Sequence, residues 1–276
     1  MDKTILITGT STGVGYGATK ALSAAGYRVI ATVRSAEDAE RLTQELGSGV
    51  HPVLCDVTRP DDVAALPAHV ARISENGWLD GLVNNAAIEL IAPAELQPME
   101  DIRALFETNV FGLMAVTKAL LPVLGTAPEA GEHEGRIVNV SSIGGVLALP
   151  LLSAYAATKH AIEGYSHSLR RELRGTGVRV IILGPGAIRS ALWRKHLPRM
   201  YEGTPYERSM ANLSELMRTS EAGAATEDAI GQFIRKLFEV RRPRARYVFT
   251  PNRLTNWTLP TLASHEMVDR MVARMI

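Results

Sequence analysis

The chain has 276 residues, of which 46% are hydrophobic, and its 30 Lys and Arg residues balance its 29 Asp and Glu residues to a net charge of +1. This length can form the core of one large α/β domain, and the charge balance lacks the basic excess typical of nucleic-acid binding. The single cysteine, Cys55, excludes an intrachain disulfide and a thiolate metal cluster. We therefore expect no nucleic-acid partner and no metal site.

The start of the chain, Met1-Asp-Lys-Thr-Ile-Leu-Ile-Thr8, contains an apolar run that is too short for a signal peptide. Elsewhere, no stretch approaches the roughly 18 uninterrupted apolar residues that would suggest a membrane span. We therefore expect a soluble, cytoplasmic protein without a membrane span.

Short apolar runs alternate with longer helical patterns along the chain. The expected strands cover residues 4–8, 28–33, 52–55, 79–84, 136–141, 178–183 and 246–249, and the expected helices lie near 15–25, 36–46, 60–75, 99–124, 152–174 and 226–240. Most of these strands are continuously apolar, which is typical of a sheet covered on both faces. The alternation predicts an α/β fold with a doubly wound parallel sheet, a Rossmann fold, in a single domain over residues 1–276.

Three segments stand apart from this alternation. Residues 186–226 are rich in Arg, Met, Leu and Trp, and we expect them to form a substrate-binding loop or lid at the carboxyl end of a strand. Apolar residues at regular intervals predict an amphipathic C-terminal helical segment over residues 259–276. The basic run Arg241-Arg-Pro-Arg-Ala-Arg246 is expected to be a solvated turn, with a phosphate or partner contact as the alternative.

A glycine-rich segment, Thr8-Gly-Thr-Ser-Thr-Gly-Val-Gly15, joins the first expected strand to the first expected helix. Its glycines permit a tight turn and a close approach to a pyrophosphate, and the helix N-terminus supplies N–H donors and a favourable dipole. Between a strand and a helix, this pattern predicts a dinucleotide site. The cofactor contacts that we assign to it are Gly9, Ser11, Thr12, Gly13, Val14 and Gly15.

The second expected strand ends in Ala31-Thr-Val-Arg34, where an NAD site would carry an acidic residue for the adenosine ribose. An arginine can instead form a bidentate pair with a 2′-phosphate, so Arg34 favours NADP(H) over NAD. Asp56 follows the third expected strand and is placed to accept a hydrogen bond from the adenine amino group. Its alternative role is to cap a helix or turn.

Tyr155 and Lys159 are four residues apart in an expected helix, so both lie on one of its faces. A cation beside a phenol favours the phenolate and lowers a tyrosine pKa that is ordinarily about 10. Ser142, on the loop after the fifth expected strand, could hydrogen-bond the oxygen that Tyr155 protonates. These three residues predict a site that interconverts a carbonyl and an alcohol.

Taken together, the motifs resemble the short-chain dehydrogenase/reductase family from the first strand to about residue 190. They are Thr8-Gly-x-x-x-Gly-x-Gly15, Asp56-Val57, Asn84-Asn-Ala-Ala87, Asn109, Val140-Ser-Ser142, Tyr155-x-x-x-Lys159 and Pro185-Gly186. The Ala-Thr-Val-Arg34 ending, Arg246-Tyr-Val and Leu259-Pro look most like the branch of hydroxysteroid and retinol dehydrogenases.

The resemblance implies a role for each matched residue. Tyr155 would be the general acid in reduction and the base in oxidation, and Ser142 would orient the substrate oxygen. Lys159 would bind the nicotinamide ribose and lower the Tyr155 pKa, while Asn109 would hold a water that links Lys159 to solvent. The other implied cofactor contacts are Asp56, Val57, Asn85, Ala86, Pro185, Gly186, Ile188 and Ser190.

The sequence departs from the family pattern at two positions. Ala87 replaces the usual glycine and puts the local packing, although not the chemistry, in question. Ser190 replaces a common threonine and keeps its hydroxyl. A glycine would be wanted at position 12 in the nucleotide-sugar epimerases, and Thr12 argues against that branch.

Apolar side chains near the expected site suggest a bulky, apolar substrate rather than a sugar or a charged acid. The substrate contacts that we assign are Ser142, Leu147, Leu149, Tyr155 and Trp193. The resulting hypothesis is an oxidoreductase that transfers a hydride between NADP(H) and a carbonyl or secondary alcohol. The alternatives are a catalytically silent dinucleotide-sensing protein and an epimerase or lyase. The resemblance also implies a homodimer or homotetramer.

Overall fold

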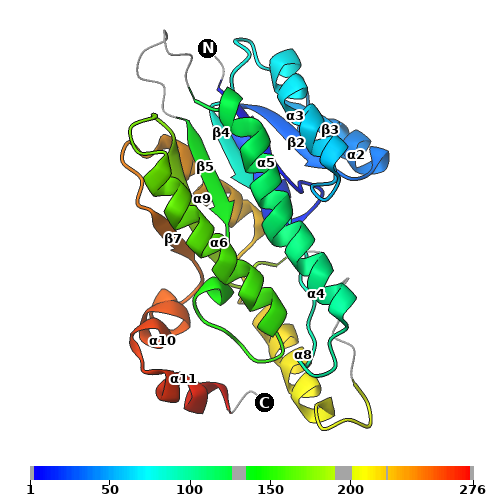
Figure 1. The fold of residues 1–276 in the computed structure, drawn as a ribbon, viewed down its shortest axis with the longest axis vertical. Helices are drawn as coiled ribbons and strands as arrows, with labels where there is room; N and C mark the ends of the chain where they lie inside the picture. The colour runs from blue at the N-terminus through cyan, green and yellow to red at the C-terminus, as the bar shows by residue number, and fades with distance from the viewer. Residues whose placement is uncertain (1–2, 126–134, 190–200, 222, 274–276) are drawn as a thin grey trace.

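Seven parallel strands form one sheet in the order β3-β2-β1-β4-β5-β6-β7 (Figure 1). The computed structural model describes residues 3–125, 135–189, 201–221 and 223–273. The strands are β1 (Thr4–Ile7), β2 (Arg28–Val33), β3 (Val50–Leu54), β4 (Gly81–Asn84), β5 (Arg136–Val140), β6 (Arg179–Pro185) and β7 (Arg246–Phe249). All seven expected strands are present, and the doubly wound parallel sheet is confirmed. The order reverses between β1 and β4, which is where such sheets bind ligands.

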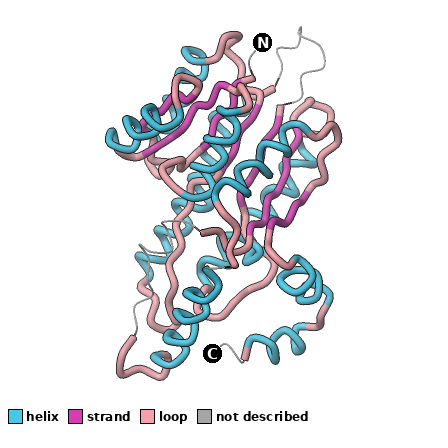
Figure 2. The backbone as a smooth tube through the Cα atoms, turned by 180° about the vertical axis from the view of Figure 1, so that it is seen from behind, coloured by secondary structure: helices cyan, strands magenta, loops and turns pink. Residues whose placement is uncertain are grey.

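Helices cover both faces of the sheet (Figures 1 and 2). One face packs against α1 (Gly13–Ala24), α2 (Ala36–Leu46) and α9 (Glu227–Glu239), and the other against α3 (Pro60–Ile73), α5 (Leu113–Leu120) and α6 (Ser153–Glu172). Along β1, Ile5 and Ile7 belong to the first core and Leu6 to the second. All three are fully buried, as their continuously apolar pattern predicts.

The expected helix over 99–124 is interrupted rather than continuous. It comprises α4 (Met99–Phe106), the π-helical segment η1 (Glu107–Gly112), α5 and the 3₁₀ turn η2 (Leu121–Val123). By length and composition alone this run could also cross a membrane, and 44% of its apolar window is buried. Because Leu105, Val116 and Leu120 are fully buried in the protein, we assign it as a core helix.

The segment after β6 contains the helix α8 (Glu207–Glu221). We did not predict this helix, because Pro198 and Pro205 interrupt the helical patterns of the segment. The C-terminal segment is not one helix, since it consists of the π-helical η4 (Leu254–Thr258), α10 (Leu259–Leu262) and α11 (His265–Val272). Ser264 starts α11 by accepting a hydrogen bond from the Met267 N–H. This capping explains why the apolar periodicity does not produce a single helix.

Helices α1 and α9 pack with their backbones in direct contact. A Cβ added to Gly231 would overlap the carbonyl oxygen of Gly17, and one added to Gly17 would overlap that of Glu227. Since the obstruction is backbone on both sides, only glycine permits this approach. The contact joins the first helix of the chain to one that begins more than two hundred residues later.

We expect Gly231→Ala to lower the free energy of unfolding by about 2–3 kcal/mol, because the added methyl group must separate α1 from α9. Chemical denaturation measured by circular dichroism tests this prediction. Gly164→Ala is the matched control, since Gly164 is exposed on α6 with no atom near its added Cβ. That control should be neutral or slightly stabilising. Equal unfolding midpoints for the two variants would contradict the proposed packing constraint.

Candidate active site

A cleft of about 500 Å³ lies at the carboxyl ends of the strands. Residues expected to bind the cofactor and residues expected to be catalytic share this one cavity. Those that line it are Gly9, Ser11, Thr12, Gly13, Val14, Arg34, Asn85, Ala86, Ser142, Leu149, Tyr155, Lys159, Pro185, Gly186 and Ile188. Ser190 and Trp193 lie outside the described residues. Gly15, Asp56, Val57, Asn109 and Leu147 are not among the residues that line it.

The conformation of the glycine-rich loop depends on positive φ angles at two glycines and on hydrogen bonds from the loop after β4. Gly9 and Gly13 have φ angles of 67° and 65°, which favour glycine. The Asn85 Nδ2 group donates to the carbonyl oxygens of Thr8 (2.9 Å) and Gly9 (2.8 Å). A Cβ at Gly15 would lie 2.5 Å from this same Nδ2 group. The described contacts of Asn85 therefore position the loop.

Ala87, the departure from the family pattern, causes no backbone strain. It lines the cleft and is not among the described residues with positive φ. The methyl group is therefore compatible with the local conformation, and glycine is not required there.

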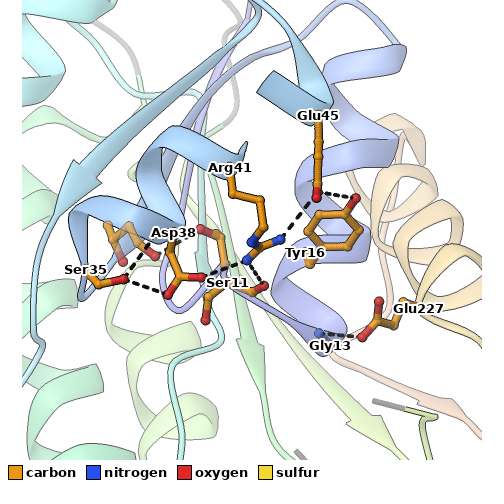
Figure 3. Close-up of polar contacts among 10 residues, drawn as sticks. Ser11, Gly13, Tyr16, Ser35, Asp38, Arg41, Glu45 and Glu227 are labelled. Atoms are coloured by element: carbon orange, nitrogen blue, oxygen red, sulfur yellow. Dashed lines mark hydrogen bonds and ion pairs between the residues drawn. The ribbon is translucent and has the colours of Figure 1, made fainter. Parts of the chain in front are cut away.

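A carboxylate from α9 also contacts the glycine-rich loop. Glu227 accepts a hydrogen bond of 2.7 Å from the Gly13 N–H (Figure 3). Burial raises the pKa of Glu227, and this hydrogen bond partly offsets the effect. Sequence reasoning missed the contact because the two residues are 214 positions apart and no local pattern connects them.

Two arginines surround the end of the cleft where an adenosine ribose would lie. Arg34 is exposed and lines the cleft. Arg41, which sequence reasoning missed, donates to the carbonyl oxygen of Ser11 (2.7 Å) and to Asp38 Oδ1 (2.8 Å), as Figure 3 shows. Asp38 also lines the cleft. Arg41 is thus engaged with Asp38. Of these two arginines, Arg34 is the one that lines the cleft and could pair with an anion.

Asp56 has the capping role that was its alternative interpretation. Its Oδ1 accepts hydrogen bonds from the Thr58 N–H (2.9 Å) and Oγ1 (2.7 Å). Burial would raise the Asp56 pKa, yet these hydrogen bonds and the charges of Arg34 and Arg59 together outweigh it and lower the pKa. Val57 is buried in the core, where a Cβ at Gly112 would touch it. Cys55, rather than either of these residues, lines the cleft.

Helix α6 brings Tyr155 and Lys159 to the cleft on one face, as their spacing predicts. The Lys159 Nζ atom is 5.6 Å from the centroid of the Tyr155 ring and donates a hydrogen bond of 3.1 Å to the Val140 carbonyl. Ser142 follows β5 in extended conformation, and its Oγ accepts from the Gly144 N–H at 3.0 Å. It is also close enough to the Tyr155 phenol to lower its pKa through a hydrogen bond.

In the protein alone, the Tyr155 pKa is raised above its ordinary value, opposite to the expected direction. Burial is the largest cause, and the negative charge of Glu89 adds to it, while Ser142 opposes both. Burial also lowers the Lys159 pKa to about 8, against the opposing effects of Glu89 and Glu163. Glu89, which sequence reasoning missed, lines the cleft together with both groups.

Asn109 lies in the π-helical segment η1 and reaches two other elements. Its Oδ1 accepts from the Ile88 N–H (2.8 Å), and its Nδ2 donates to the Ile88 carbonyl (2.9 Å) and to Thr158 Oγ1 (3.2 Å). π-Helical turns are frequent at functional sites. The Asn109 side chain thus fixes the loop after β4 against α6.

The basic run before β7 is not simply a solvated turn. Arg246 donates to both carboxylate oxygens of Glu163 (3.0–3.2 Å) and to the Ser142 carbonyl (3.3 Å). Its guanidinium lies 4.2 Å from the centroid of the Trp257 ring. Arg246 therefore supports the loop that carries Ser142 from the edge of the sheet, and the expectation of a solvated position is wrong for this residue.

Replacing Lys159 by methionine should abolish activity and yet stabilise the fold. Below about pH 8, the folded protein must hold a buried ammonium, so Lys159→Met should raise the free energy of unfolding at pH 7 by about 1–2 kcal/mol. As pH rises from about 8 to about 10.4, folded Lys159 loses its proton before the unfolded chain does, and the wild type recovers this stability. Denaturation at a series of pH values measures the difference, and a destabilised variant at pH 7 contradicts it.

Comparison with known proteins agrees with this geometry. Residues 3–200 match the short chain dehydrogenase family. The chain is 30% identical to an NADPH-dependent 3-dehydrocapnine reductase of Ornithobacterium rhinotracheale, over 96% of this chain and 94% of the relative. It is 37% identical to human retinol dehydrogenase 16, over 70% of this chain and 59% of that protein.

A solved structure of a short-chain dehydrogenase from Streptomyces avermitilis matches with a TM-score of 0.79 and 30% identity, covering 99% of this chain and 98% of that one. The fold, the cleft and the matched motifs thus lead to one conclusion. This chain belongs to the short-chain dehydrogenase/reductase family of NAD(P)-dependent oxidoreductases that act on alcohols and carbonyls, and it resembles the hydroxysteroid and retinol dehydrogenase branch.

Proposed function

We propose that this protein transfers a hydride between NADP(H) and the carbonyl or secondary alcohol of a bulky, apolar substrate, with Tyr155 as general acid and base. The observation that carries this proposal is that Ser142, Tyr155 and Lys159 share one cleft with the glycine-rich loop. A proton donor and a dinucleotide site in the same cavity are the two requirements of carbonyl reduction.

The cleft fits a dinucleotide, because its glycines provide a backbone surface that side chains would block. The loop from Gly9 to Gly15 would hold the pyrophosphate, and Arg34 the 2′-phosphate. At the other end, a Cβ at Gly186 would lie 2.5 Å from Thr250 Oγ1, so this position also excludes a side chain. Pro185, Gly186, Ile188 and Ser190 would contact the nicotinamide end, and Lys159 its ribose. The bound dinucleotide supplies the hydride.

The protein supplies the proton and orients the substrate oxygen that receives it. Because burial raises its pKa, Tyr155 is protonated near neutral pH and can donate to a carbonyl oxygen that gains negative charge. The Ser142 hydroxyl can hydrogen-bond the same oxygen. Charged Lys159 favours the phenolate that remains, and a water held near Asn109 would return the proton. These roles make reduction the favoured reaction of the protonated enzyme.

Apolar side chains support a bulky, apolar substrate. Among the residues that line the cleft are the apolar Ile91, Ile143, Leu149, Leu151, Leu213, Leu216 and Met217. Three of these come from α8, in the segment that we expected to form a lid. Leu149 keeps its assigned role in the proposal. Leu147, which does not line the cleft, is withdrawn from the proposed substrate contacts.

The preference for NADP(H) rests on Arg34 and is supported by a relative that is named as NADPH-dependent. A homo-oligomer rests on the family resemblance alone. A cytoplasmic location follows from the sequence expectation alone.

Tyr155→Phe should retain cofactor binding and lose turnover on the order of a thousandfold, because only the proton donor is removed. Turnover is measured by absorbance of the reduced nicotinamide with a panel of ketones and alcohols, and cofactor affinity by calorimetry. Undiminished turnover in this variant would refute the acid and base role. Cofactor binding without turnover of any substrate by the wild type would indicate the silent sensor. Product without net cofactor oxidation would indicate an epimerase or lyase.

Arg34→Asp should weaken NADPH binding relative to NADH on the order of 10- to 100-fold, because a carboxylate replaces the partner of the 2′-phosphate. Dissociation constants of both cofactors measure this ratio. Arg242→Asp makes the same charge change at an exposed position outside the cleft and should leave the ratio unchanged. Equal affinities of the wild type for the two cofactors would defeat the phosphate-pairing argument.

A further inference from the structure

Glu89 is an acidic residue inside the catalytic end of the cleft that the proposed reaction does not use. It lines the cavity with Tyr155 and Lys159, and its charge raises the pKa of both. Burial raises the pKa of Glu89 itself, and the Lys159 charge lowers it. Among the described residues, no hydrogen bond or ion pair to the Glu89 carboxylate is present, whereas the Lys159 ammonium donates to the Val140 carbonyl.

The backbone that precedes Glu89 is held in place by hydrogen bonds. The preceding residue, Ile88, is held at both its N–H and its carbonyl by the Asn109 side chain, at 2.8 Å and 2.9 Å. The same Asn109 amide donates to Thr158, the neighbour of Lys159 on α6. The backbone that carries the carboxylate is therefore tied to the helix that carries the catalytic pair.

An unpaired carboxylate at this place is unfavourable in two ways. Glu89 is partly buried in the cleft, and reducing the contact of its charge with water without a hydrogen-bonded partner costs free energy. A negative charge near Tyr155 also disfavours the phenolate that general catalysis requires. One change would remove both penalties, namely a positive charge brought into the cleft by a ligand. A charged side chain in a cleft with such an effect on its neighbours is a candidate for a functional role.

We propose that Glu89 binds a protonated amine of the substrate, adjacent to the reacting carbon, so that the substrate class is amino alcohols and amino ketones with a long apolar chain. This inference rests on the function proposed above and narrows its substrate. The apolar side chains of α8 and of the loop before α6 would take the chain, and Glu89 would take the ammonium. The ion pair selects the substrate by charge, while the cleft selects it by shape.

The pair also has a consequence for the rate. An ammonium beside Glu89 cancels the negative charge that acts on Tyr155, so its phenolate becomes easier to form once substrate is bound. A neutral substrate of the same shape leaves that charge in place. The amine should therefore raise kcat as well as lower KM, and binding alone cannot produce this combination.

The test measures oxidation of three alcohols by the wild-type enzyme with NADP⁺. The pH is about 8, at which aliphatic amines are mostly protonated. They are 1-aminododecan-2-ol, dodecane-1,2-diol, in which a hydroxyl replaces the amine, and 12-aminododecan-2-ol, in which the amine is at the far end. In each, the C2 alcohol carbon would lose a hydride to NADP⁺ and its hydroxyl would lose a proton to the Tyr155 phenolate, which gives the ketone, NADPH and protonated Tyr155. We expect kcat/KM of the first to exceed that of the other two on the order of a hundredfold.

Glu89→Gln should remove this preference, with a loss on the order of a hundredfold for 1-aminododecan-2-ol and a gain in kcat for the diol. Calorimetric binding of the amino alcohol to the enzyme with NADPH gives a readout independent of turnover and should weaken in parallel. Glu100→Gln is the matched control, since Glu100 is exposed on α4 outside the cleft, and it should change neither quantity. The wild-type comparison stands even where a variant fails to fold.

The outcomes separate the two proposals. Turnover of the diol without any preference for the adjacent amine would overturn the role of Glu89 and leave the hydride transfer intact. Equal losses for all three alcohols in Glu89→Gln would also overturn it, because they would indicate a proton relay or a structural role. No turnover of any alcohol or of the matching ketones, with NADPH still bound, would overturn the proposed function and this inference together.

Discussion

The site depends on a set of hydrogen bonds between the ends of β1 and β4, where the strand order reverses. Thr8 donates its N–H to the Val83 carbonyl, and its hydroxyl accepts from the N–H groups of Asn85 and Ala86. The Asn85 amide in turn holds the carbonyls of Thr8 and Gly9. The backbone that shapes the glycine-rich loop and the backbone that leads to Glu89 are therefore one hydrogen-bonded unit. Loss of any of its members would disturb cofactor and catalytic ends together.

A second set of buried side chains extends this unit to the catalytic helix. Asn84 donates to Asn139 on β5 at 2.9 Å, and Asn139 donates to Ser166 on α6 at 2.8 Å. On the same helix, Glu163 binds Arg246, which also donates to the Ser142 carbonyl. These hydrogen bonds restrict how β4, β5 and α6 are placed relative to one another. The restriction is incomplete, because Asn84 Oδ1 and Arg246 Nη1 are buried without a hydrogen-bond partner among the described residues.

The features predictable from sequence are those encoded locally. Continuous apolar strands, the glycine spacing and the interval from Tyr155 to Lys159 each follow from a single segment, and the fold that they predicted is confirmed. Contacts such as Glu227 with Gly13, or Arg246 with Glu163, join segments that no periodicity connects, so they were missed. The Tyr155 pKa was expected in the wrong direction because burial and Glu89 are tertiary effects. Glu89 itself could have been noticed, since it directly follows the Asn84-Asn-Ala-Ala87 motif.

The contact between Glu227 and Gly13 has a consequence for synthesis of the protein. Chains emerge from the ribosome N-terminus first, so the glycine-rich loop leaves the exit tunnel long before α9 is translated. Until then, the Gly13 N–H lacks its carboxylate partner, and α1 lacks the glycine face of α9. A nascent chain that ends before residue 227 would thus hold the glycine-rich loop only through its contacts with the loop after β4, and the contact with Glu227 would form last.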